Sequence, residues 1–411
     1  MRVLLLSYAC EPGRGSEPGV GWNWASHLGA EHDVCVLTRE NNREAIEHVT
    51  ATRPLPRVRF VYFDLPRWAR VWKKGNRGIR LYYYLWQLGA ARVAKRLHAE
   101  QPFDVAHHVT FVKYWMPSAA TAVDVPVVWG PVGGGESTPS AFMGMLSAPG
   151  RAYEWARELL RAVGELDPLV RRTARRATLA LATTVDSERR MRAIGARDVR
   201  VLSEAGLSNA DLDMLEAIPL SGAGPLRMVS IGNLIHLKAF DLGLRAFARF
   251  RQAGGEGVYH VVGGGPERPR LEALCAALGI SGHVTFHGQV PRTEALARLR
   301  ESDILVHPSL HDSGGWVCLE AMAAGRPPLC LDLGGPGLQV TAETGIKVPA
   351  ESPGQAVAAL SEAMLTLWRR PERRLQLAEA GRRYVRDGYA WPRKIERMTA
   401  LYEQVVAGGL R

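Results

Sequence analysis

The stretch His311–Pro327 reads HDSGGWVCLEAMAAGRP and places two carboxylates, Asp312 and Glu320, around a glycine turn. Just before it, the run Ile304–Pro308 predicts a short buried strand, which Pro308 helps to stop. The glycines permit a tight turn, and Trp316–Ala324 is predicted to continue as a helix. An anion fits at such a helix start, because the first backbone N–H groups are unpaired and carry partial positive charge.

We expect the two carboxylates to have separate roles. Asp312 lies in the loop and Glu320 about one turn inside the helix, so they would hold hydroxyl-bearing groups on either side of a phosphate. One group would be a sugar and the other a ribose. Taken alone, the pattern is equally typical of an N-capping aspartate and a solvated glutamate, so the rest of the chain has to decide.

Strands and helices alternate around this motif. Three further strands are predicted in the C-terminal half, and each runs into glycine: Leu226–Ile231, Val258–Val262 and Val284–His287. An amphipathic helix at about Asp241–Arg251 follows the first of them, with Lys238 near its start. The alternation predicts a parallel, doubly wound sheet whose ligand lies at the carboxyl ends of the strands.

The N-terminal half begins with a similar unit. The apolar strand Arg2–Tyr8 is followed by a glycine-rich loop, a helix at about Trp22–Leu28 and the strand Val34–Thr38. A later strand ends in His107 and His108, whose side chains would point to opposite faces, so one of the two is expected to face the site. The Gly-x-Gly-x-x-Gly dinucleotide fingerprint is absent in this form, which argues against a nicotinamide enzyme.

With these motifs the chain resembles the glycosyltransferases of family 4 over essentially its whole length. The acidic pair of that family, two glutamates separated by seven residues, appears here as Asp312 and Glu320. Its Gly-Arg…Lys-Gly phosphate motif lies within residues 232–239, and its Gly-x-Gly-Pro turn is residues 263–266. Two positions depart from the pattern, because Asn233 replaces the usual arginine and Asp312 replaces the usual glutamate.

The resemblance implies the α/β fold called GT-B, in which two Rossmann-like, doubly wound domains face each other across a cleft. It implies an N-terminal acceptor-binding domain at 1–216 and a donor-binding domain at 226–390. A stretch of proline, glycine and serine at 217–225 predicts the linker between them. The segment 391–411 would be a helix that crosses back to the N-terminal domain.

The resemblance also implies a retaining, metal-independent hexosyltransferase that uses a UDP- or GDP-sugar and no cofactor. The acceptor would be a saccharide or lipid-linked saccharide of surface polysaccharide or glycolipid assembly, with a soluble natural product as the alternative. The residues with catalytic roles would be Lys238, Asp312 and one of His107 and His108. The residues that bind the donor would be Gly19, Gly21, Gly232, Asn233, Lys238, Gly264, Ser313, Gly314, Gly315 and Glu320. The residues near the acceptor would be Glu17, Gly134 and Glu136.

Other functions are open at this point. A nucleotide-sugar epimerase would share the fold, and a non-catalytic scaffold is favoured by Asn233, which removes a cationic fork from a diphosphate site. Asp211-Leu212-Asp213 matches the metal-binding Asp-x-Asp of the other glycosyltransferase fold, GT-A. We interpret that match as a coincidence, because it follows no suitable strand and precedes the linker. No metal site is predicted.

The charge of the chain suggests a partner. The net charge is +11, and residues 51–100 hold 12 Lys and Arg against two acidic residues. Aromatic residues interleave with these charges at 67–96, so we expect that region to bind an anionic membrane surface. A second basic cluster would share one helix face: Arg171, Arg172, Arg175 and Arg176. No nucleic-acid recognition module is found, so no nucleic-acid partner is expected.

The sequence also predicts a cellular location. No stretch approaches the roughly 20 apolar residues of a transmembrane helix, and the N-terminus reads as a core strand instead of a signal peptide. Five cysteines without paired spacing favour free thiols in a reducing compartment. We therefore expect a cytoplasmic protein, with peripheral binding at the inner face of the membrane.

Overall fold

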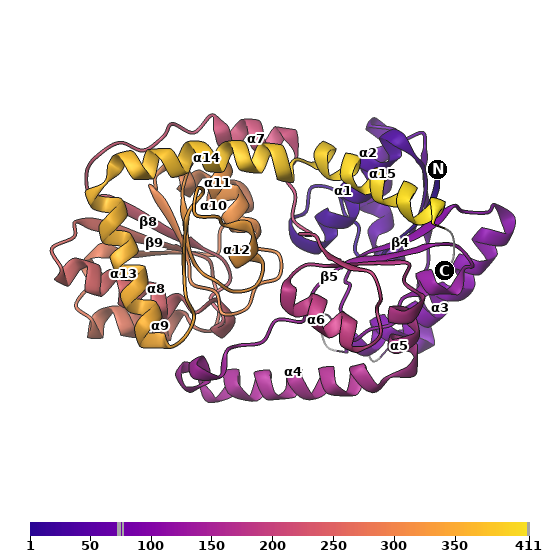
Figure 1. Cartoon of the computed structure of the whole chain (residues 1–411), viewed down its shortest axis with the longest axis horizontal. Helices are drawn as coiled ribbons and strands as arrows, with labels where there is room; N and C mark the ends of the chain where they lie inside the picture. The colour runs from indigo at the N-terminus through magenta and orange to yellow at the C-terminus, as the bar shows by residue number, and fades with distance from the viewer. Residues whose placement is uncertain (72–74, 76–77, 409–411) are drawn as a thin grey trace. The chain divides into compact units, whose positions relative to one another are not determined.

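The computed structural model describes residues 1–71, 75 and 78–408, and the chain divides into two compact units (Figure 1). Unit 1 comprises Met1–Gly135, Glu158–Glu204 and Trp391–Arg411. Unit 2 comprises Glu136–Arg157 and Ala205–Ala390. Each unit contains one parallel β-sheet with helices packed against it, which confirms the predicted pair of Rossmann-like α/β domains.

The described part of unit 1 contains a seven-stranded sheet in the order β3-β2-β1-β4-β5-β6-β7. Its strands are β1 (Arg2–Ser7), β2 (Asp33–Thr38), β3 (Val58–Tyr62), β4 (Val105–Thr110), β5 (Val127–Val132), β6 (Leu179–Ala182) and β7 (Val199–Val201). Its helices are α1 (Ser16–Glu31), α2 (Arg43–Thr52), α3 (Ile79–Glu100), α5 (Pro168–Arg176), α6 (Val185–Ala193) and α15 (Trp391–Ala407). The strand order reverses between β1 and β4, so ligands are expected where those two strands end.

The sheet of unit 2 has six strands among the described residues, in the order β10-β9-β8-β11-β12-β13. They are β8 (Leu226–Ile231), β9 (Gly257–Val262), β10 (Val284–Gly288), β11 (Ile304–His307), β12 (Pro328–Leu331) and β13 (Ile346–Val348). The helices are α7 (Asn209–Glu216), α8 (Phe240–Gln252), α9 (Arg268–Ala277), α10 (Arg292–Arg300), α11 (Trp316–Ala323), α12 (Gly334–Gln339), α13 (Pro353–Arg369) and α14 (Pro371–Tyr389). Here the order reverses between β8 and β11. One more helix, α4 (Ala148–Leu166), begins in unit 2 and ends in unit 1.

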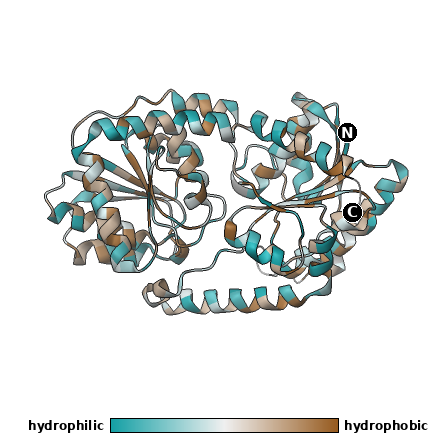
Figure 2. Ribbon diagram, viewed as in Figure 1, coloured by the Kyte–Doolittle hydropathy of each residue, from teal (hydrophilic) through white to brown (hydrophobic). Residues whose placement is uncertain are grey.

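Strand β8 shows why the sheet of unit 2 is covered on both sides. Its Leu226 and Met228 pack into one apolar cluster with α8 and α13, whereas Val229 packs into a second cluster with α11. Successive side chains of a strand point to opposite faces, so an apolar run builds both layers at once. Figure 2 shows the same pattern, with hydrophobic residues gathered on the strands and both colours alternating along the helices.

The division of the chain corrects the predicted boundaries. Unit 2 begins at Ala205 instead of after a linker at 217–225, because Leu212 and Leu215 of α7 are buried in its core. Residues 136–157 were expected in the N-terminal domain and belong to unit 2 instead. The contacts that hold residues 136–157 in unit 2 are with residues far along the chain, such as His311, so the local sequence gives no sign of them.

The structure corrects the aromatic part of the membrane surface expected at 67–96, while membrane binding by its basic residues stays a prediction. Tyr82, Tyr83 and Trp86 are fully buried, because their helical spacing turns them toward the sheet, while Trp68 is 78% exposed. Four other residues of that prediction lie outside the described residues: Trp72, Lys73, Lys74 and Arg77. Within the described part of the chain, no helix has the length and apolar character needed to cross a membrane.

Candidate active site

In unit 2, two charged side chains meet where the strand order reverses. The loop after β8 ends in a short helical turn that carries Lys238, and the loop after β11 carries Asp312. Lys238 Nζ lies 2.5 Å from Asp312 Oδ2, and both side chains are about four-fifths buried. The pair forms because β8 and β11 are neighbours in the sheet, although 71 residues lie between Ile231, the last residue of β8, and Asp303, the residue before β11.

The Asp312 carboxylate organises the glycine turn. Its Oδ1 accepts hydrogen bonds from the backbone N–H groups of Gly314 (3.2 Å) and Gly315 (3.1 Å), and His307 Nε2 donates to its Oδ2 at 3.0 Å. Burial raises the pKa of this carboxyl, but Lys238 and His307 outweigh burial and hold the pKa well below its usual range. The turn predicted to bind an anion therefore holds the chain's own carboxylate.

A second loop braces that turn. Gly315 precedes α11 with φ +57°, and a Cβ there would lie 2.3 Å from Gln339 Oε1, so only glycine fits. Gln339 Nε2 donates to Gly314 O at 2.6 Å, and the N–H of Gly335 donates to Asp312 O at 2.8 Å. The loop after β12 thus fixes the one after β11. Sequence reasoning missed Gln339.

Glu320, the second carboxylate of the motif, lies on α11 and has an arginine partner. Arg292 Nη2 is 2.7 Å from Glu320 Oε1, while Arg292 Nη1 is 3.0 Å from Asp211 Oδ1. Burial raises the pKa of Glu320, and Arg292 partly opposes that shift. Sequence reasoning missed Arg292, because it lies 28 residues from Glu320 on another helix.

The Asp-x-Asp match has an ordinary structural explanation. Asp211 pairs with Arg292, while Asp213 pairs with Arg386 at 2.9 Å. The two carboxylates therefore bind different arginines and do not converge. This agrees with our interpretation of the match as a coincidence.

The remaining donor-site predictions of unit 2 lie in the loops after β8, β9 and β11. The N–H of Gly232 donates to Val262 O at 2.9 Å, and Gly264 O accepts from the N–H of Leu234 at 2.8 Å. Asn233 is exposed, and neither its side chain nor that of Ser313 hydrogen-bonds to any described residue. The structure thus brings the loops together and leaves these two polar side chains available.

The segment 136–157 packs beside the charged pair. His311 Nε2 donates to Glu136 O at 2.7 Å, and His236 Nε2 donates to Glu154 Oε1 at 3.4 Å. Burial, and then nearby Arg157, lower the pKa of His311 to about 4, so this imidazole is neutral at pH 7. Glu136 was expected on an acceptor-binding wall of the N-terminal domain, and the structure corrects this, placing it in unit 2.

In unit 1, the predicted glycine-rich loop is shorter than expected. Helix α1 begins at Ser16 instead of Trp22, so Gly19 and Gly21 lie inside it and are buried. A Cβ on Gly19 would lie 2.0 Å from Arg14 O, and one on Gly21 would lie 2.1 Å from Ala9 O. These glycines let the helix approach the chain after β1, and their approach to the donor phosphate stays a prediction.

The other predicted acceptor residues also have partners in unit 1. Glu17 Oε2 accepts from the N–H of Phe111 at 2.5 Å, which joins the segments after β1 and β4. Burial raises the pKa of Glu17, against the opposing effects of that N–H group and of Lys113. Gly134 has φ +96° and packs against Trp115, where a Cβ would lie 2.5 Å from the indole.

Both histidines of β4 are buried, so neither is open to a ligand in unit 1. His107 donates from Nε2 to Gly130 O at 2.6 Å and accepts at Nδ1 from Tyr402 OH at 2.5 Å. His108 donates from Nδ1 to Ser118 Oγ at 2.9 Å, and its Nε2 accepts at 3.0 Å from the hydroxyl of a buried tyrosine. Burial lowers the pKa of His107 to about 4 and of His108 to about 3. The expectation that one of them faces the site is corrected, because the helices cover both faces of the strand.

Comparisons with known proteins agree with this architecture. A model of the glycosyl transferase 4-like domain matches residues 15–203, and one of glycosyl transferases group 1 matches residues 216–384. A 2-deoxystreptamine glucosyltransferase of Streptomyces kanamyceticus is 27% identical over 82% of this chain and 79% of its own length. A D-inositol 3-phosphate glycosyltransferase of Salinispora tropica is 33% identical, but over only 43% of this chain and 38% of that protein.

Solved structures show the same fold. The sucrose-phosphate synthase of Thermosynechococcus elongatus superposes with a TM-score of 0.67 at 20% identity, over 99% of both chains. The Anabaena protein HepE, solved in complex with UDP and glucose, superposes with a TM-score of 0.59 at 16% identity, over 98% of this chain and 99% of the other. At these identities the structural similarity establishes the fold alone, and the reaction has to be argued from the site residues.

Proposed function

Because the chain belongs to the family 4-like glycosyltransferases of the GT-B fold, we propose that it moves a hexose from a UDP- or GDP-sugar to a hydroxyl of a saccharide or lipid-linked saccharide. The bond from the anomeric carbon to the diphosphate breaks, a bond to the acceptor oxygen forms on the same face, and the acceptor proton is lost. One observation carries the donor assignment: the Lys238–Asp312 pair beside a glycine turn at the reversal point of unit 2.

Lys238 is the group proposed to stabilise the leaving diphosphate. Its ammonium lies at the carboxyl end of the central strands and is one-fifth exposed, so an incoming anion can reach it. In this structure its partner is a single carboxylate, which a phosphate oxygen can replace. A cation placed where charge develops lowers the barrier of the step in which the diphosphate leaves.

Asp312 is proposed to orient the donor sugar. Its pKa lies well below its usual range, so it is a hydrogen-bond acceptor throughout the physiological range. With His307 and two backbone N–H groups already fixing it, the carboxylate can accept from a sugar hydroxyl without reorganising the turn. Because aspartate is one methylene shorter than glutamate, its carboxylate would contact different sugar hydroxyls from those that the usual glutamate of the family contacts.

Glu320 is proposed to hold the nucleotide ribose. Two ribose hydroxyls can donate to an ionised carboxylate, and Arg292 both orients that carboxylate and favours its charged form. Arg292 itself is anchored by Asp211. Arg292 is therefore proposed as a positioning residue for the nucleotide subsite.

No metal or cofactor is proposed for the reaction. Lys238 supplies positive charge at the leaving group, and Asp211 and Asp213 are engaged by arginines. The test of this part of the proposal is turnover in excess EDTA, which should equal turnover in added magnesium or manganese.

The acceptor is proposed to bind through unit 1, around the joined segments after β1 and β4 where Glu17 lies. A lipid-linked saccharide of surface polysaccharide or glycolipid assembly, with peripheral membrane binding, is our first candidate because the chain carries a net charge of +11. A soluble acceptor is the second, supported by the 2-deoxystreptamine glucosyltransferase, which matches four-fifths of the chain. The exposed Asn233, in place of an arginine, keeps a non-catalytic scaffold as the alternative to both.

The experiment is nucleotide release from UDP-glucose, UDP-galactose and GDP-mannose, with a polyprenyl-diphosphate-linked monosaccharide, 2-deoxystreptamine or no acceptor. We expect release of one nucleotide that depends on an acceptor and is unchanged by EDTA. Lys238→Ala should slow this release by a factor on the order of 10² to 10³, and Arg249→Ala, which removes an exposed cation of the same unit, should not. Sugar isomerisation without any acceptor would indicate an epimerase, and no release with any donor would favour the scaffold.

A further inference from the structure

Helix α4 has its polar side chains turned inward and its apolar side chains turned outward. The residues Glu154, Arg157 and Arg161 are at most 6% exposed. After Arg151, every exposed residue of the helix is apolar. The large ones are Tyr153 (44% exposed), Trp155 (72%), Leu159 (65%), Leu160 (44%), Val163 (61%) and Leu166 (71%), which we call the α4 stripe.

The inverted orientation is stable because each buried polar group is paired. Arg157 donates to Glu136 O at 2.9 Å, Glu154 accepts from Thr138 Oγ1 at 3.2 Å, and Arg161 donates to Gly134 O. The polar face is therefore the one that holds the helix to the protein. The apolar face is left uncovered, and a contiguous apolar surface of this kind marks a binding surface.

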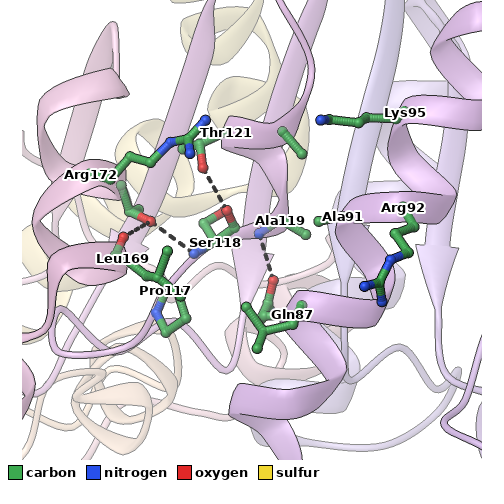
Figure 3. A pocket seen from close by; sticks show the side chains of 13 residues that line it. Gln87, Ala91, Arg92, Lys95, Pro117, Ser118, Ala119, Thr121, Leu169 and Arg172 are labelled. Atoms are coloured by element: carbon green, nitrogen blue, oxygen red, sulfur yellow. Dashed lines mark hydrogen bonds between the residues drawn. The ribbon is translucent and has the colours of Figure 1, made fainter.

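A basic pocket lies close to the C-terminal end of the stripe. It is a cavity of about 200 Å³ in unit 1, between α3, the segment 117–122 and α5, with Leu88, Ala91 and Leu169 among its apolar lining. Figure 3 shows Arg92 and Lys95 extending from α3, and Arg172 from α5, around this cavity. All three cations are exposed and have no acidic partner among the described residues.

The stripe and the pocket adjoin along the chain. Leu166 ends the stripe and Leu169 lines the pocket, so their Cα atoms are at most about 11 Å apart. The acidic residues of this end of α4 are neutralised: Glu158 pairs with Arg161, and Glu165 pairs with Arg190 at 3.0 Å. The uncompensated charge beside the stripe is therefore positive, which complements an anionic surface.

We propose that α4 docks on an anionic lipid bilayer, with the stripe in the boundary between headgroups and acyl chains and the basic pocket holding a lipid phosphate. Amphipathic helices with aromatic and leucine residues on one face bind membrane interfaces in this way, and nearby cations add attraction to anionic lipids. A second copy of the chain fits less well, because it carries the same net charge of +11 and so complements the uncompensated cations less well than an anionic surface does. The membrane-binding surface rests on the proposed function, because it would bring the enzyme to a lipid-linked acceptor. It does not depend on which sugar is transferred.

The test is co-sedimentation of the full chain with vesicles of phosphatidylcholine alone or with 30% phosphatidylglycerol. We expect binding to the anionic vesicles that weakens at 500 mM NaCl and falls at least tenfold in Leu159→Glu/Val163→Glu. The matched control is Met214→Glu/Leu375→Glu, which places the same charges at exposed apolar positions of unit 2 and should bind like the parent. Equal binding of the stripe variant and the parent would overturn the proposal.

A second arm tests the pocket. Arg92→Ala/Lys95→Ala/Arg172→Ala should lose the preference for anionic vesicles, whereas Arg249→Ala/Arg300→Ala/Arg383→Ala, with the same net charge, should keep it. Equal losses in both triple variants would show a general charge effect and overturn the role of the pocket. A parent dimer that becomes a monomer in the stripe variant, without vesicle binding by either, would establish the second copy instead.

Two further measurements distinguish a loss of membrane binding from a folding defect and from a failure of the proposed donor site. UDP and GDP binding by calorimetry should be the same in the stripe variant and the parent, whatever the donor proves to be. In the folded parent, anionic vesicles should shift the tryptophan emission to the blue, and Trp155→Phe should remove most of that shift, because Trp155 is 72% exposed. Vesicle binding without any contribution from Trp155 would count against α4 as the docking helix.

Discussion

The two units use the same architecture differently at corresponding places. In unit 2 the strand order reverses between β8 and β11, and the loops there hold an ion pair, a glycine turn and side chains open to a ligand. In unit 1 it reverses between β1 and β4, where Glu17 binds a backbone N–H and the histidines of β4 are buried. The fold determines where the loops after the central strands meet. The residues in those loops determine whether that position carries charged side chains that a ligand can reach or buried side chains that stabilise the fold.

This contrast supports our proposal that unit 2 carries the donor chemistry. A diphosphate needs a cation and backbone N–H groups, and both converge on Asp312 before any ligand arrives. The polar groups at the reversal point of unit 1 are already paired with one another. Variants in the two units should therefore differ in kind. Those of Lys238, Arg292 and Glu320 in unit 2 should change turnover or nucleotide binding, whereas those of the buried β4 histidines in unit 1 should mainly change stability.

The largest expected effect is that of Lys238→Ala on turnover. Removing the cation at the leaving group should lower kcat by a factor on the order of 10² to 10³, as for other groups that stabilise developing charge. The measurement is initial-rate kinetics with circular dichroism as a check of folding. A normal kcat in a folded variant would show that Lys238 does not stabilise the leaving group, and the proposed catalytic difference between the two units would be lost.

A smaller effect is expected from the Arg292–Glu320 pair. Glu320→Gln should weaken nucleotide binding by about 1.5 to 3 kcal/mol, the usual worth of hydrogen bonds to a charged group. Arg292→Ala should cost less, and the double variant should cost less than the sum, because Arg292 acts through Glu320. Additive losses in this double-mutant cycle would show that Arg292 touches the nucleotide independently.

The pH dependence of nucleotide binding tests the proposed role of Glu320. Burial raises the pKa of Glu320 above its ordinary value, and the protonated carboxyl loses acceptor capacity, so affinity should fall as the pH decreases through that pKa. Asp312, whose pKa lies well below its usual range, stays ionised over the same interval. Calorimetry over decreasing pH should show a steeper decline in the parent than in Glu320→Gln, which keeps only the decline caused by protonation of the terminal phosphate of the nucleotide.

The smallest effect on activity is expected in unit 1. His107→Phe leaves Gly130 O and Tyr402 OH without their partner, which should lower the free energy of unfolding by about 1 to 3 kcal/mol. Because the ring is buried, kcat should change little. Urea unfolding and kinetics on the same sample check this, and a large loss of kcat at unchanged stability would restore a catalytic role to His107.

The fold was largely predictable from local patterns. The strand Leu226–Ile231 has the predicted bounds, and the strand Ile304–His307 ends one residue before the predicted end at Pro308. Continuous apolar runs that end at a loop are typical of buried strands. Helix α11 ends within one residue of its predicted end. The start of α1 was missed because Gly19 and Gly21 suggest a loop, whereas both are packed inside a helix.

The site was only half predictable. Lys238, Asp312 and Glu320 were found because each lies within a short motif. Arg292 and Gln339 come from distant elements and left no local signal. The burial of both β4 histidines depends on helices that cover the sheet, and the outward stripe of α4 depends on partners of its polar face, so neither could be derived from periodicity alone.

The central claim is that unit 2 holds a nucleoside diphosphate through Lys238 without a metal ion. Isothermal calorimetry with UDP and with GDP, in excess EDTA, tests it on the parent, Lys238→Ala and the Arg249→Ala control. We predict that one nucleotide binds the parent and the control alike and binds the Lys238 variant far more weakly. Binding of neither nucleotide, or equal binding to all three proteins, would contradict the assignment.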